Sequence, residues 1–308
     1  MLDLQEILSK KDDHRIGKTG YVALLGRPNT GKSTLLNTVL HRHLAAVSPK
    51  PQTTRKYLLG IQTDEDSQIL FLDAPGIHSG KIAIDEAMDA SIRRVMHDAD
   101  VVVCMVDPTR EPGAEDGLAV AAAVKSKKPV IIAINKNDVA TEEQVAASLD
   151  FYRKSLPDAP VVRIVALDIK RVQSLLVLIK ERLPEGPFLY SEDEMTDVYE
   201  RDVAAELIRE TLLEELKQEV PHCAAVTIDS WKETGNRISI EATLNVEREG
   251  HRGIILGQGG SMIRRIRECA TKKIAEFCGG RINLRLFVKV VPDWRNRKRF
   301  LKDIHLMD

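Results

Sequence analysis

A glycine-rich loop close to the N-terminus constrains the fold more than any other feature. It reads Gly26-Arg27-Pro28-Asn29-Thr30-Gly31-Lys32-Ser33-Thr34. The apolar run 21–25 precedes it and apolar residues at helical spacing follow, so the loop should join a strand to a helix. The pattern G-x-x-x-x-G-K-S in this setting predicts a phosphate-binding loop, because its glycines let backbone N–H groups turn inward at a helix N-terminus. Lys32 would reach the outer phosphates, and Ser33 would bind magnesium.

Two later segments extend this interpretation to a magnesium nucleotide. The stretch 45–55 contains two prolines and the sequence Gln52-Thr53-Thr54-Arg55, which predicts an exposed loop. Strands are then expected at 56–61 and 68–72, and the second ends in Asp73-Ala74-Pro75-Gly76. An aspartate at the end of a strand beside a phosphate loop holds magnesium directly or through water. The N–H group of Gly76 could then sense a γ-phosphate.

A third motif predicts that the base is guanine. Continuous apolar strands are expected at 101–106 and 130–134, and the second delivers Asn135-Lys136-Asn137-Asp138. The Asp138 carboxylate can accept two hydrogen bonds, from the ring N–H and the amino group of guanine. Adenine offers neither, so such a contact can discriminate by roughly 10⁴-fold.

The expected elements define the class of the first domain. Helices are expected at 84–97, 114–125, 142–155 and 172–183, with a short strand at 161–165. Alternating strands and helices predict a doubly wound α/β sheet, with the motif loops at the carboxyl ends of its strands.

Bulk properties limit the class of protein. A chain of 308 residues should form about two domains, and 43% hydrophobic with 30% charged residues is typical of a globular protein. The four cysteines form no C-x-x-C pair, which favours reduced thiols in a cytosolic protein. The N-terminus lacks a signal-peptide core, and no run reaches the length of a spanning helix. Any membrane contact would therefore be made from the surface.

The net charge of −1 hides an uneven distribution. Acidic residues dominate 185–219, and basic residues dominate 251–302. A basic segment in a neutral chain predicts a localised polyanion site, although two solvated helical faces would give the same pattern.

A second domain is expected after a connector rich in turn residues. Its order is a helix at 197–220, strands at 225–231 and 237–246, two helices about Gly257-Gln258-Gly259-Gly260, and a strand at 283–290. A tight glycine turn between helices lets the backbone approach a nucleic-acid backbone, with Arg252, Arg264 and Arg265 supplying positive charge. The alternative is an ordinary corner between two helices.

Two further expectations concern this domain. Aromatic residues make up only 4% of the chain, which argues against a stacking platform and favours backbone grip and base-edge hydrogen bonds. The tail 295–302 could add phosphate contacts or form a solvated C-terminal helix, and the second interpretation is preferred.

The quoted motifs resemble the translation-factor-related GTPases. G-R-P-N-x-G-K-S-T, Q-T-T-R, D-x-P-G and N-K-x-D are shared by the Era, Der and MnmE branches of that family. Followed by an order typical of a type II KH domain, they are similar to the Era family over nearly the whole chain after residue 18. The resemblance implies a P-loop GTPase domain at 19–183, a linker at 184–196 and an α+β KH domain at 197–308, with residues 1–18 as an extension.

The resemblance also implies a mechanism. The family hydrolyses GTP to GDP and phosphate, slowly and with Mg²⁺, and the counterpart of Thr54 binds the metal in the GTP state. The metal ligands expected here are therefore Ser33, Thr54 and Asp73, and the catalytic residues are Asn29, Lys32, Thr54 and Gly76. The residues expected at the nucleotide are Gly26, Arg27, Pro28, Asn29, Thr30, Gly31, Lys32, Ser33, Thr34, Asp73, Ala74, Pro75, Gly76, Ile77, Asn135, Lys136, Asn137, Asp138, Val165, Ala166 and Leu167. Those expected at RNA are Arg252, Gly257, Gln258, Gly259, Gly260, Arg264 and Arg265.

The chain departs from the family pattern at three places. The last guanine box, Ser-Ala in the family, reads Val165-Ala166-Leu167, which loses a hydroxyl but keeps the N–H groups that would meet the guanine oxygen. Ile77 stands where Ras-type enzymes have the glutamine that positions water. Relatives use K⁺ instead, bound partly by the counterpart of Asn29, whose alternative role is to cap a turn. The third departure is Arg264 to Arg267, where the family often has Lys-x-Ile-Gly.

The family binds the 3′ end of small-subunit (16S-type) ribosomal RNA and assists assembly of the 30S subunit. The resemblance thus implies a cytoplasmic, monomeric GTPase with GTP, GDP and that RNA as partners, and peripheral association with the cell membrane. Two other functions remain open. The chain could be an RNA chaperone in which hydrolysis is secondary, or a peripheral membrane or cell-cycle GTPase.

Overall fold

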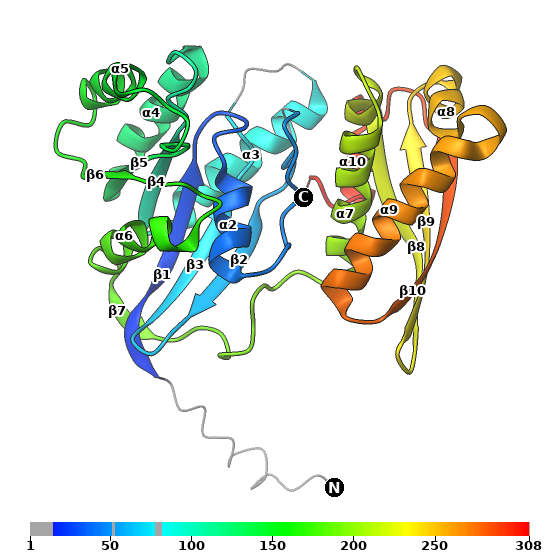
Figure 1. Ribbon diagram of the computed structural model, residues 1–308, viewed down its shortest axis with the longest axis horizontal. Coiled ribbons are helices and arrows are strands. Elements are labelled where there is room, and N and C mark those ends of the chain that lie inside the picture. The colour runs from blue at the N-terminus through cyan, green and yellow to red at the C-terminus, as the bar shows by residue number, and fades with distance from the viewer. Residues whose placement is uncertain (1–14, 51–52, 78–81, 308) are drawn as a thin grey trace, which may run out of the picture.

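The computed structural model describes residues 15–50, 53–77 and 82–307, which form two domains side by side (Figure 1). The connector after β7 (Glu185–Pro187) crosses from the first domain to the second. No helix within these ranges is long and apolar enough to cross a membrane. All four cysteines are free thiols, and two of them, Cys104 and Cys223, are buried.

The first domain is built on a seven-stranded sheet in the order β2-β3-β1-β4-β5-β6, with β7 added along β1. The strands are β1 (Ile16–Leu25), β2 (Leu58–Thr63), β3 (Ser67–Asp73), β4 (Val101–Val106), β5 (Val130–Ile134), β6 (Val161–Arg163) and β7. β1, β3, β4, β5 and β6 are parallel, whereas β2 pairs with β3 in the antiparallel sense. The carboxyl ends of the parallel strands therefore meet at one edge, where the motif loops emerge.

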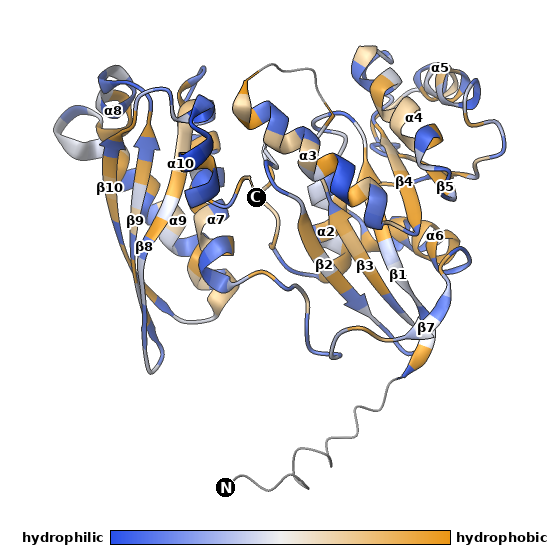
Figure 2. Cartoon of the chain, turned by 180° about the vertical axis from the view of Figure 1, so that it is seen from behind, coloured by the Kyte–Doolittle hydropathy of each residue, from blue (hydrophilic) through white to orange (hydrophobic). Residues whose placement is uncertain are grey.

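Helices cover both faces of this sheet. They are α2 (Lys32–Leu40), α3 (Ala83–Asp98), α4 (Ala114–Ser126), α5 (Glu142–Arg153) and α6 (Ile169–Lys180). Successive residues of β1 enter opposite cores: Val22 and Leu24 pack with α2 and α6, and Ala23 and Leu25 pack with α3, α4 and α5. β4, which lies inside the sheet, is accordingly hydrophobic along its whole length (Figure 2). The predicted doubly wound sheet is confirmed.

The second domain packs three helices on one face of a three-stranded sheet. Its elements are α7 (Glu200–Glu215), β8 (Ala224–Thr234), β9 (Arg237–Val246), α8 (Glu249–Leu256), α9 (Ser261–Cys278) and β10 (Arg281–Val290). β9 lies in the centre, antiparallel to β8 and parallel to β10. Alternate residues of β9, from Ile238 to Val246, are buried beneath the helices. This is the helix–strand–strand–helix–helix–strand order expected from the sequence.

Several elements differ from the sequence-based expectation at their ends. β1 begins at Ile16 and pairs with β7, so residues 16–18 join the sheet, and residues 1–14 lie outside the described ranges. α6 begins three residues earlier than expected because Asp168 caps it, accepting a hydrogen bond from the Lys170 N–H group at 2.9 Å. α7 ends at Glu215, and a 3₁₀ turn, η1 (Val220–Cys223), contains Pro221.

The C-terminal tail forms the preferred helix, and Arg297, Lys298, Arg299 and Lys302 are exposed, but one side of the tail is buried. It forms a 3₁₀ turn, η3 (Trp294–Asn296), and a short helix, α10 (Lys298–Asp303). Trp294 and Leu301 are fully buried and pack with Ala83 and Ile84 at the start of α3 in the first domain. The tail thus lies between the two domains, because its aromatic and leucine side chains remove apolar surface from water there.

Candidate nucleotide site and RNA-binding surface

The glycine-rich loop joins β1 to α2 with the backbone geometry that a phosphate needs. Gly31 has φ +95° and directly precedes α2, whose first turn receives no side-chain cap from the described residues. A Cβ atom at Gly31 would lie 2.3 Å from the Asn135 amide nitrogen, and one at Gly26 would lie 2.5 Å from the Met105 carbonyl. Only glycine fits at either position, and the N–H groups at the start of α2 are available to an anion.

Lys32 lies inside this loop rather than in solvent. Its side chain is 6% exposed, and its ammonium donates hydrogen bonds to the carbonyls of Gly26 (3.1 Å) and Arg27 (3.0 Å). Burial lowers the pKa of Lys32 to about 8, although the charge of Asp73 opposes this shift. A phosphate bound in the loop would supply further negative charge to stabilise this buried cation.

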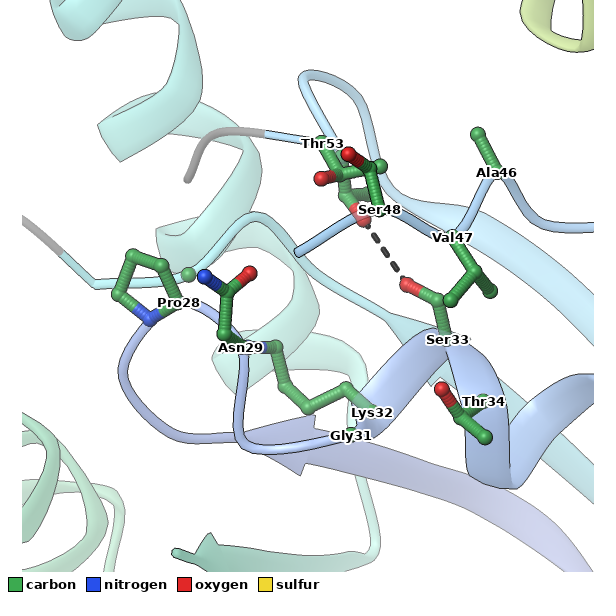
Figure 3. A pocket seen from close by; sticks show the side chains of 12 residues that line it. Pro28, Asn29, Gly31, Lys32, Ser33, Thr34, Ala46, Val47, Ser48 and Thr53 are labelled. Atoms are coloured by element: carbon green, nitrogen blue, oxygen red, sulfur yellow. Dashed lines mark hydrogen bonds between the residues drawn. The ribbon is translucent and has the colours of Figure 1, made fainter. Parts of the chain in front are cut away.

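The three residues predicted to hold magnesium lie in one cluster. The Ser33 hydroxyl donates to Asp73 Oδ2 at 2.6 Å. It also lies 3.0 Å from the Thr54 hydroxyl, a contact that Figure 3 marks with a dashed line. Asp73 is fully buried, and burial raises its pKa to about 6. Its second oxygen, Oδ1, has no hydrogen-bond partner among the residues that the structure describes. Two hydroxyls and a carboxylate with an unsatisfied oxygen are hard oxygen ligands, so these residues fit Mg²⁺.

No group of three histidine, cysteine or acidic residues able to hold a metal occurs in the part of the chain that the structure describes. A magnesium ion at the Ser33 cluster needs no such group. It is commonly bound by one or two protein ligands together with waters and phosphate oxygens.

Gly76 and Ile77 fold back onto the phosphate loop. A Cβ atom at Gly76 would lie 2.7 Å from the Pro28 nitrogen, so no larger residue fits. The Ile77 N–H group donates to the Gly26 carbonyl at 3.2 Å, while its side chain is 7% exposed and belongs to the core with α3 and α4. Ala74 and Pro75 are also buried. Ile77 therefore has a packing role and no means of positioning water.

Asn29 lines a pocket together with Lys32, Ser33 and other residues of the phosphate loop, which Figure 3 shows from close by. It has φ +67°, and its amide nitrogen donates to the Pro49 carbonyl at 2.7 Å. Because the side-chain nitrogen makes this hydrogen bond, the side-chain oxygen of Asn29 remains as an acceptor for another group. The two roles weighed for Asn29, turn residue and cation ligand, are thus compatible with one conformation.

The guanine motifs meet the phosphate loop through one asparagine. Asn135, 3% exposed, donates to the Thr30 carbonyl at 2.8 Å and accepts from the Ala166 N–H group at 2.8 Å. The loops 135–138 and 165–167 are thereby held beside the phosphate loop. Val165 and Ala166 are buried, Leu167 is 80% exposed, and Asp138 is exposed at the protein surface. Asn137 supports the arrangement by donating its N–H group to the Ile164 carbonyl at 3.3 Å.

Arg27 was predicted at the nucleotide, but its side chain points elsewhere. Its guanidinium is buried against Asp116 of α4 at 2.6 Å. Arg27 can therefore contribute only its backbone to a phosphate.

The glycine turn of the second domain is open on its outer side. Gly257, Gly259 and Gly260 all have positive φ, between +58° and +75°. A Cβ atom at Gly257 would clash with Met262 at 2.7 Å, whereas one at Gly259 or Gly260 would meet no atom of the described residues within 4 Å. The turn thus requires glycine for its conformation and exposes its backbone.

Three arginines predicted for RNA lie around this turn. Arg264 and Arg265 are exposed near the start of α9, and Arg252 lies on α8. Arg265 forms an ion pair with Glu215, and Arg252 approaches Glu249 at 3.4 Å. Because both arginines are exposed, an incoming polyanion can compete for them at low cost.

Sequence patterns did not indicate a polar interface between the domains. The Arg55 guanidinium donates to the carbonyls of His222 and Ala224, both at 2.8 Å. From the second domain, Arg209 of α7 donates to the Thr53 carbonyl, and Glu210 accepts from the Val47 N–H group at 2.8 Å. The loop that carries Thr54 is therefore bonded to the second domain on both sides of that residue.

The site and the fold together define a class of protein: a P-loop GTPase domain followed by a KH domain. Comparisons agree, since residues 21–136 match the family described as "50S ribosome-binding GTPase" and residues 219–295 match the KH domain family. GTPase Era of Clostridium botulinum (strain Eklund 17B / Type B) is 41% identical over 93% of this chain and 98% of its own length. GTPase Era of Lacticaseibacillus paracasei is 39% identical over 93% of this chain and 96% of its own length. This chain belongs to the GTPase Era family.

Solved structures give the same result over both domains. A single-residue variant of Aquifex aeolicus Era bound to GDP.AlF4⁻ matches with a TM-score of 0.89 and 35% identity, over 94% of this chain and 100% of that one. Era in complex with MgGDPNP and nucleotides 1506–1542 of 16S ribosomal RNA matches with the same TM-score and identity, over 95% of this chain and 100% of that one.

Proposed function

We propose that this protein is a GTP-hydrolysing switch that binds the 3′ end of small-subunit ribosomal RNA and assists assembly of the 30S subunit. The Era protein that binds MgGDPNP and a 16S fragment is its full-length structural relative. The open glycine turn with its exposed arginines supplies the RNA surface here.

One observation carries the proposal that the two activities are linked. Thr54 lies 3.0 Å from the Ser33 hydroxyl in the magnesium cluster, while its neighbours Thr53 and Arg55 bond to the second domain. A change at Thr54 must therefore move groups that the second domain holds.

The residues of the site suggest how hydrolysis acts on this loop. Ser33 and Thr54, supported by Asp73, would hold Mg²⁺, which when bound neutralises phosphate charge. Lys32 and the loop amides bind the phosphates, and Gly76 senses the outermost one. Loss of that phosphate releases Thr54 and Gly76, and the contacts of Thr53 and Arg55 then change.

A path to the RNA surface continues through α7. Glu210, which is 1% exposed, accepts hydrogen bonds from Val47 in the first domain and from Lys273 of α9 at 2.9 Å. α9 begins immediately after the glycine turn. The same carboxylate thus contacts both the Thr54 loop and the helix that presents Arg264 and Arg265.

We also propose that potassium assists hydrolysis. Ile77 cannot position water. Asn29 belongs to the phosphate loop and donates its side-chain nitrogen to the Pro49 carbonyl, so its side-chain oxygen is the atom that a cation would meet. A monovalent cation at Asn29 would bring positive charge to the phosphates. GTPase rates measured in K⁺ and Na⁺ at equal ionic strength should differ, and equal rates would contradict the proposal.

The remaining expectations complete this proposal. The first domain is 19–183, extended by residues 16–18 of β1 and by β7, and the second is 197–308, with the rest of 184–196 between them. The protein works as a monomer in the cytoplasm and associates peripherally with the membrane. If hydrolysis were secondary to an RNA-chaperone role, a Lys32→Ala protein would still support ribosome maturation. If the membrane were the main partner, vesicles would bind the protein even with competing RNA present.

Crosslinking in cells followed by sequencing of the bound RNA tests the RNA partner. We expect recovery of the 3′ end of the small-subunit RNA. Scattered messenger or transfer RNA would contradict the proposal.

A further inference from the structure

The side chain of Arg27 takes part in a hydrogen-bond network outside the nucleotide pocket. It is 3% exposed, and its two terminal nitrogens meet four acceptors. Nη1 donates to Asp116 Oδ2 at 2.6 Å and to the Glu111 carbonyl at 3.0 Å. Nη2 donates to the carbonyls of Asp107 at 2.7 Å and Arg110 at 3.1 Å. The phosphate loop is therefore fastened to the segment 107–116, which joins β4 to α4.

Asp116 is fixed as firmly as the arginine that it binds. Its Oδ2 also accepts from the Gly113 N–H group at 2.9 Å, and its Oδ1 accepts from the Tyr152 hydroxyl of α5 at 2.8 Å. Asp116 and Tyr152 are both buried. Three donors surround this carboxylate, so the Arg27 end of the network has little freedom to move.

Asp107 connects this network to the guanine motif. Its backbone carbonyl binds Arg27, while its side-chain Oδ2 accepts from the Lys136 ammonium at 2.6 Å. Its Oδ1 accepts from the Thr109 hydroxyl at 2.6 Å. Asp107 is 2% exposed, and hydrogen bonds from Lys136 and Thr109 outweigh burial and lower its pKa, so it is ionised at neutral pH. One residue thus holds the phosphate loop with its backbone and the N-K-x-D loop with its side chain.

We propose that Asp107, Asp116 and Tyr152 are positioning residues that set the distance and orientation between the phosphate loop and the guanine loop. Asn135 already bridges the two loops directly through Thr30. The segment 107–116 adds a second connection that binds the side chains of Arg27 and Lys136. A guanine nucleotide spans both loops, so its affinity depends on how well they are aligned as well as on each loop's own contacts. This inference concerns the GTPase site alone and stands independently of the proposed RNA partner.

The test compares whole and partial ligands on the full-length Asp107→Asn protein. The substitution keeps the backbone carbonyl and the side-chain shape but removes the charge that holds Lys136. Competition against fluorescent GDP gives the affinities of GDP, guanosine and magnesium pyrophosphate. Lys180→Gln is the matched control, because it removes ion pairs of similar length (2.6 and 2.8 Å to Asp64 and Asp66) near the start of β3.

For Asp107→Asn we expect GDP to bind about tenfold more weakly, the usual loss for a charge-assisted hydrogen bond. Guanosine and pyrophosphate should each stay within about twofold, because each touches only one loop. Lys180→Gln should leave all three affinities within about twofold, since its ion pairs do not involve the loops.

Tyr152→Phe tests the other end of the same network without removing a charge. We expect about threefold weaker GDP binding, because Asp116 loses one of three donors. A thermal melt of each variant shows that the measurements are made on folded protein. Unchanged GDP affinity in a folded Asp107→Asn protein would overturn the proposal, since a purely structural role predicts only a lower Tm. The proposal would also be overturned if the affinity for guanosine fell by the same factor as that for GDP while the affinity for pyrophosphate stayed unchanged. Asp107 would then act only on the base.

Discussion

At the scale of single residues, two buried charges of opposite sign, Asp73 and Lys32, stand out in the candidate nucleotide site. Burial raises the pKa of Asp73 to about 6 and lowers that of Lys32 to about 8. Because the pKa of Asp73 is higher in the folded protein than in the unfolded chain, this group stabilises the fold at pH values below its unfolded pKa. The stabilisation is lost as the pH rises through its folded pKa of about 6. Because the pKa of Lys32 is lower in the folded protein, this group stabilises the fold at pH values above its unfolded pKa. The stabilisation is lost as the pH falls through its folded pKa of about 8. Near pH 7 both charges therefore cost stability, which bound metal and phosphate would offset.

Asp73→Asn should consequently stabilise the nucleotide-free protein. At pH 7 we expect its free energy of unfolding to rise by up to about 3 kcal/mol, since each pKa unit corresponds to ~1.4 kcal/mol. Below about pH 4 the gain should vanish because the carboxyl is protonated in both states. Urea unfolding at the two pH values measures this. A loss of stability at pH 7 would show that the Asp73 charge supports the fold.

Asp138→Asn tests the guanine contact. The amide keeps one acceptor and replaces the other with a donor, which faces the donors of guanine. We expect GTP affinity to fall roughly 100-fold or more, because a polar group is left unpaired on each side. The affinity for xanthosine triphosphate should rise in the same variant, because xanthine has a carbonyl acceptor where guanine has its amino group. Competition between the two nucleotides measures this. Unchanged GTP affinity would place the base elsewhere.

At the scale of elements, local patterns predicted well whatever depends on neighbouring residues. β4 at 101–106 and β5 at 130–134 have their predicted bounds. A continuous apolar run bounded by turn residues is typical of a strand buried on both faces of a parallel sheet, so the ends of the run mark the ends of the strand. The proximity of Ser33 and Asp73 was likewise predictable, since the carboxyl ends of the parallel strands β1 and β3 meet at one edge. Thr54 was expected there only from the family resemblance.

What local patterns could not predict depends on contacts between distant segments. β7 is three residues long and exists through pairing with β1, which composition does not reveal. Trp294 is buried against the start of α3, a segment far away in the sequence. The side chains of Arg209, Glu210 and Thr211 are buried within the apolar stretch of α7. Three polar residues inside such a stretch are the one sequence signal that could have indicated the interface.

The contact between α7 and the Thr54 loop gives a prediction at this scale. Arg209→Lys removes the planar fork that joins Glu206 to the Thr53 carbonyl. We expect the ratio of RNA affinities in the GTP-like and GDP states to shrink by about three- to fivefold, the size of one lost hydrogen bond. GDP affinity should stay within about twofold, with Lys180→Gln as the control. A ratio equal to that of the wild type would exclude Arg209 from the coupling.

At the scale of the whole molecule, basic residues dominate one segment, 251–302, of the domain that would meet RNA. If about four phosphates are engaged, the salt slope for single-stranded RNA should be near −3, and affinity should fall roughly fifty-fold between 50 and 200 mM salt. Fluorescence anisotropy with a labelled RNA over that range measures the slope. An interaction insensitive to salt would indicate a protein partner instead.

The two domains share a polar interface around Thr54 and an apolar contact around Trp294. Both contacts involve parts of the first domain next to the nucleotide site: the loop that carries Thr54 and the start of α3. A nucleotide that rearranges these parts must change the energy of the interface, and by reciprocity RNA must change nucleotide affinity.

The most direct test is the affinity of the full-length protein for a fragment of the small-subunit RNA 3′ end, measured with a non-hydrolysable GTP analogue and with GDP at fixed salt. We expect at least about fivefold tighter binding with the analogue, the lower end of ordinary allosteric coupling. By reciprocity, RNA should raise the affinity for the analogue relative to that for GDP by the same factor. Equal RNA affinities in the two nucleotide states would contradict a GTP-controlled switch.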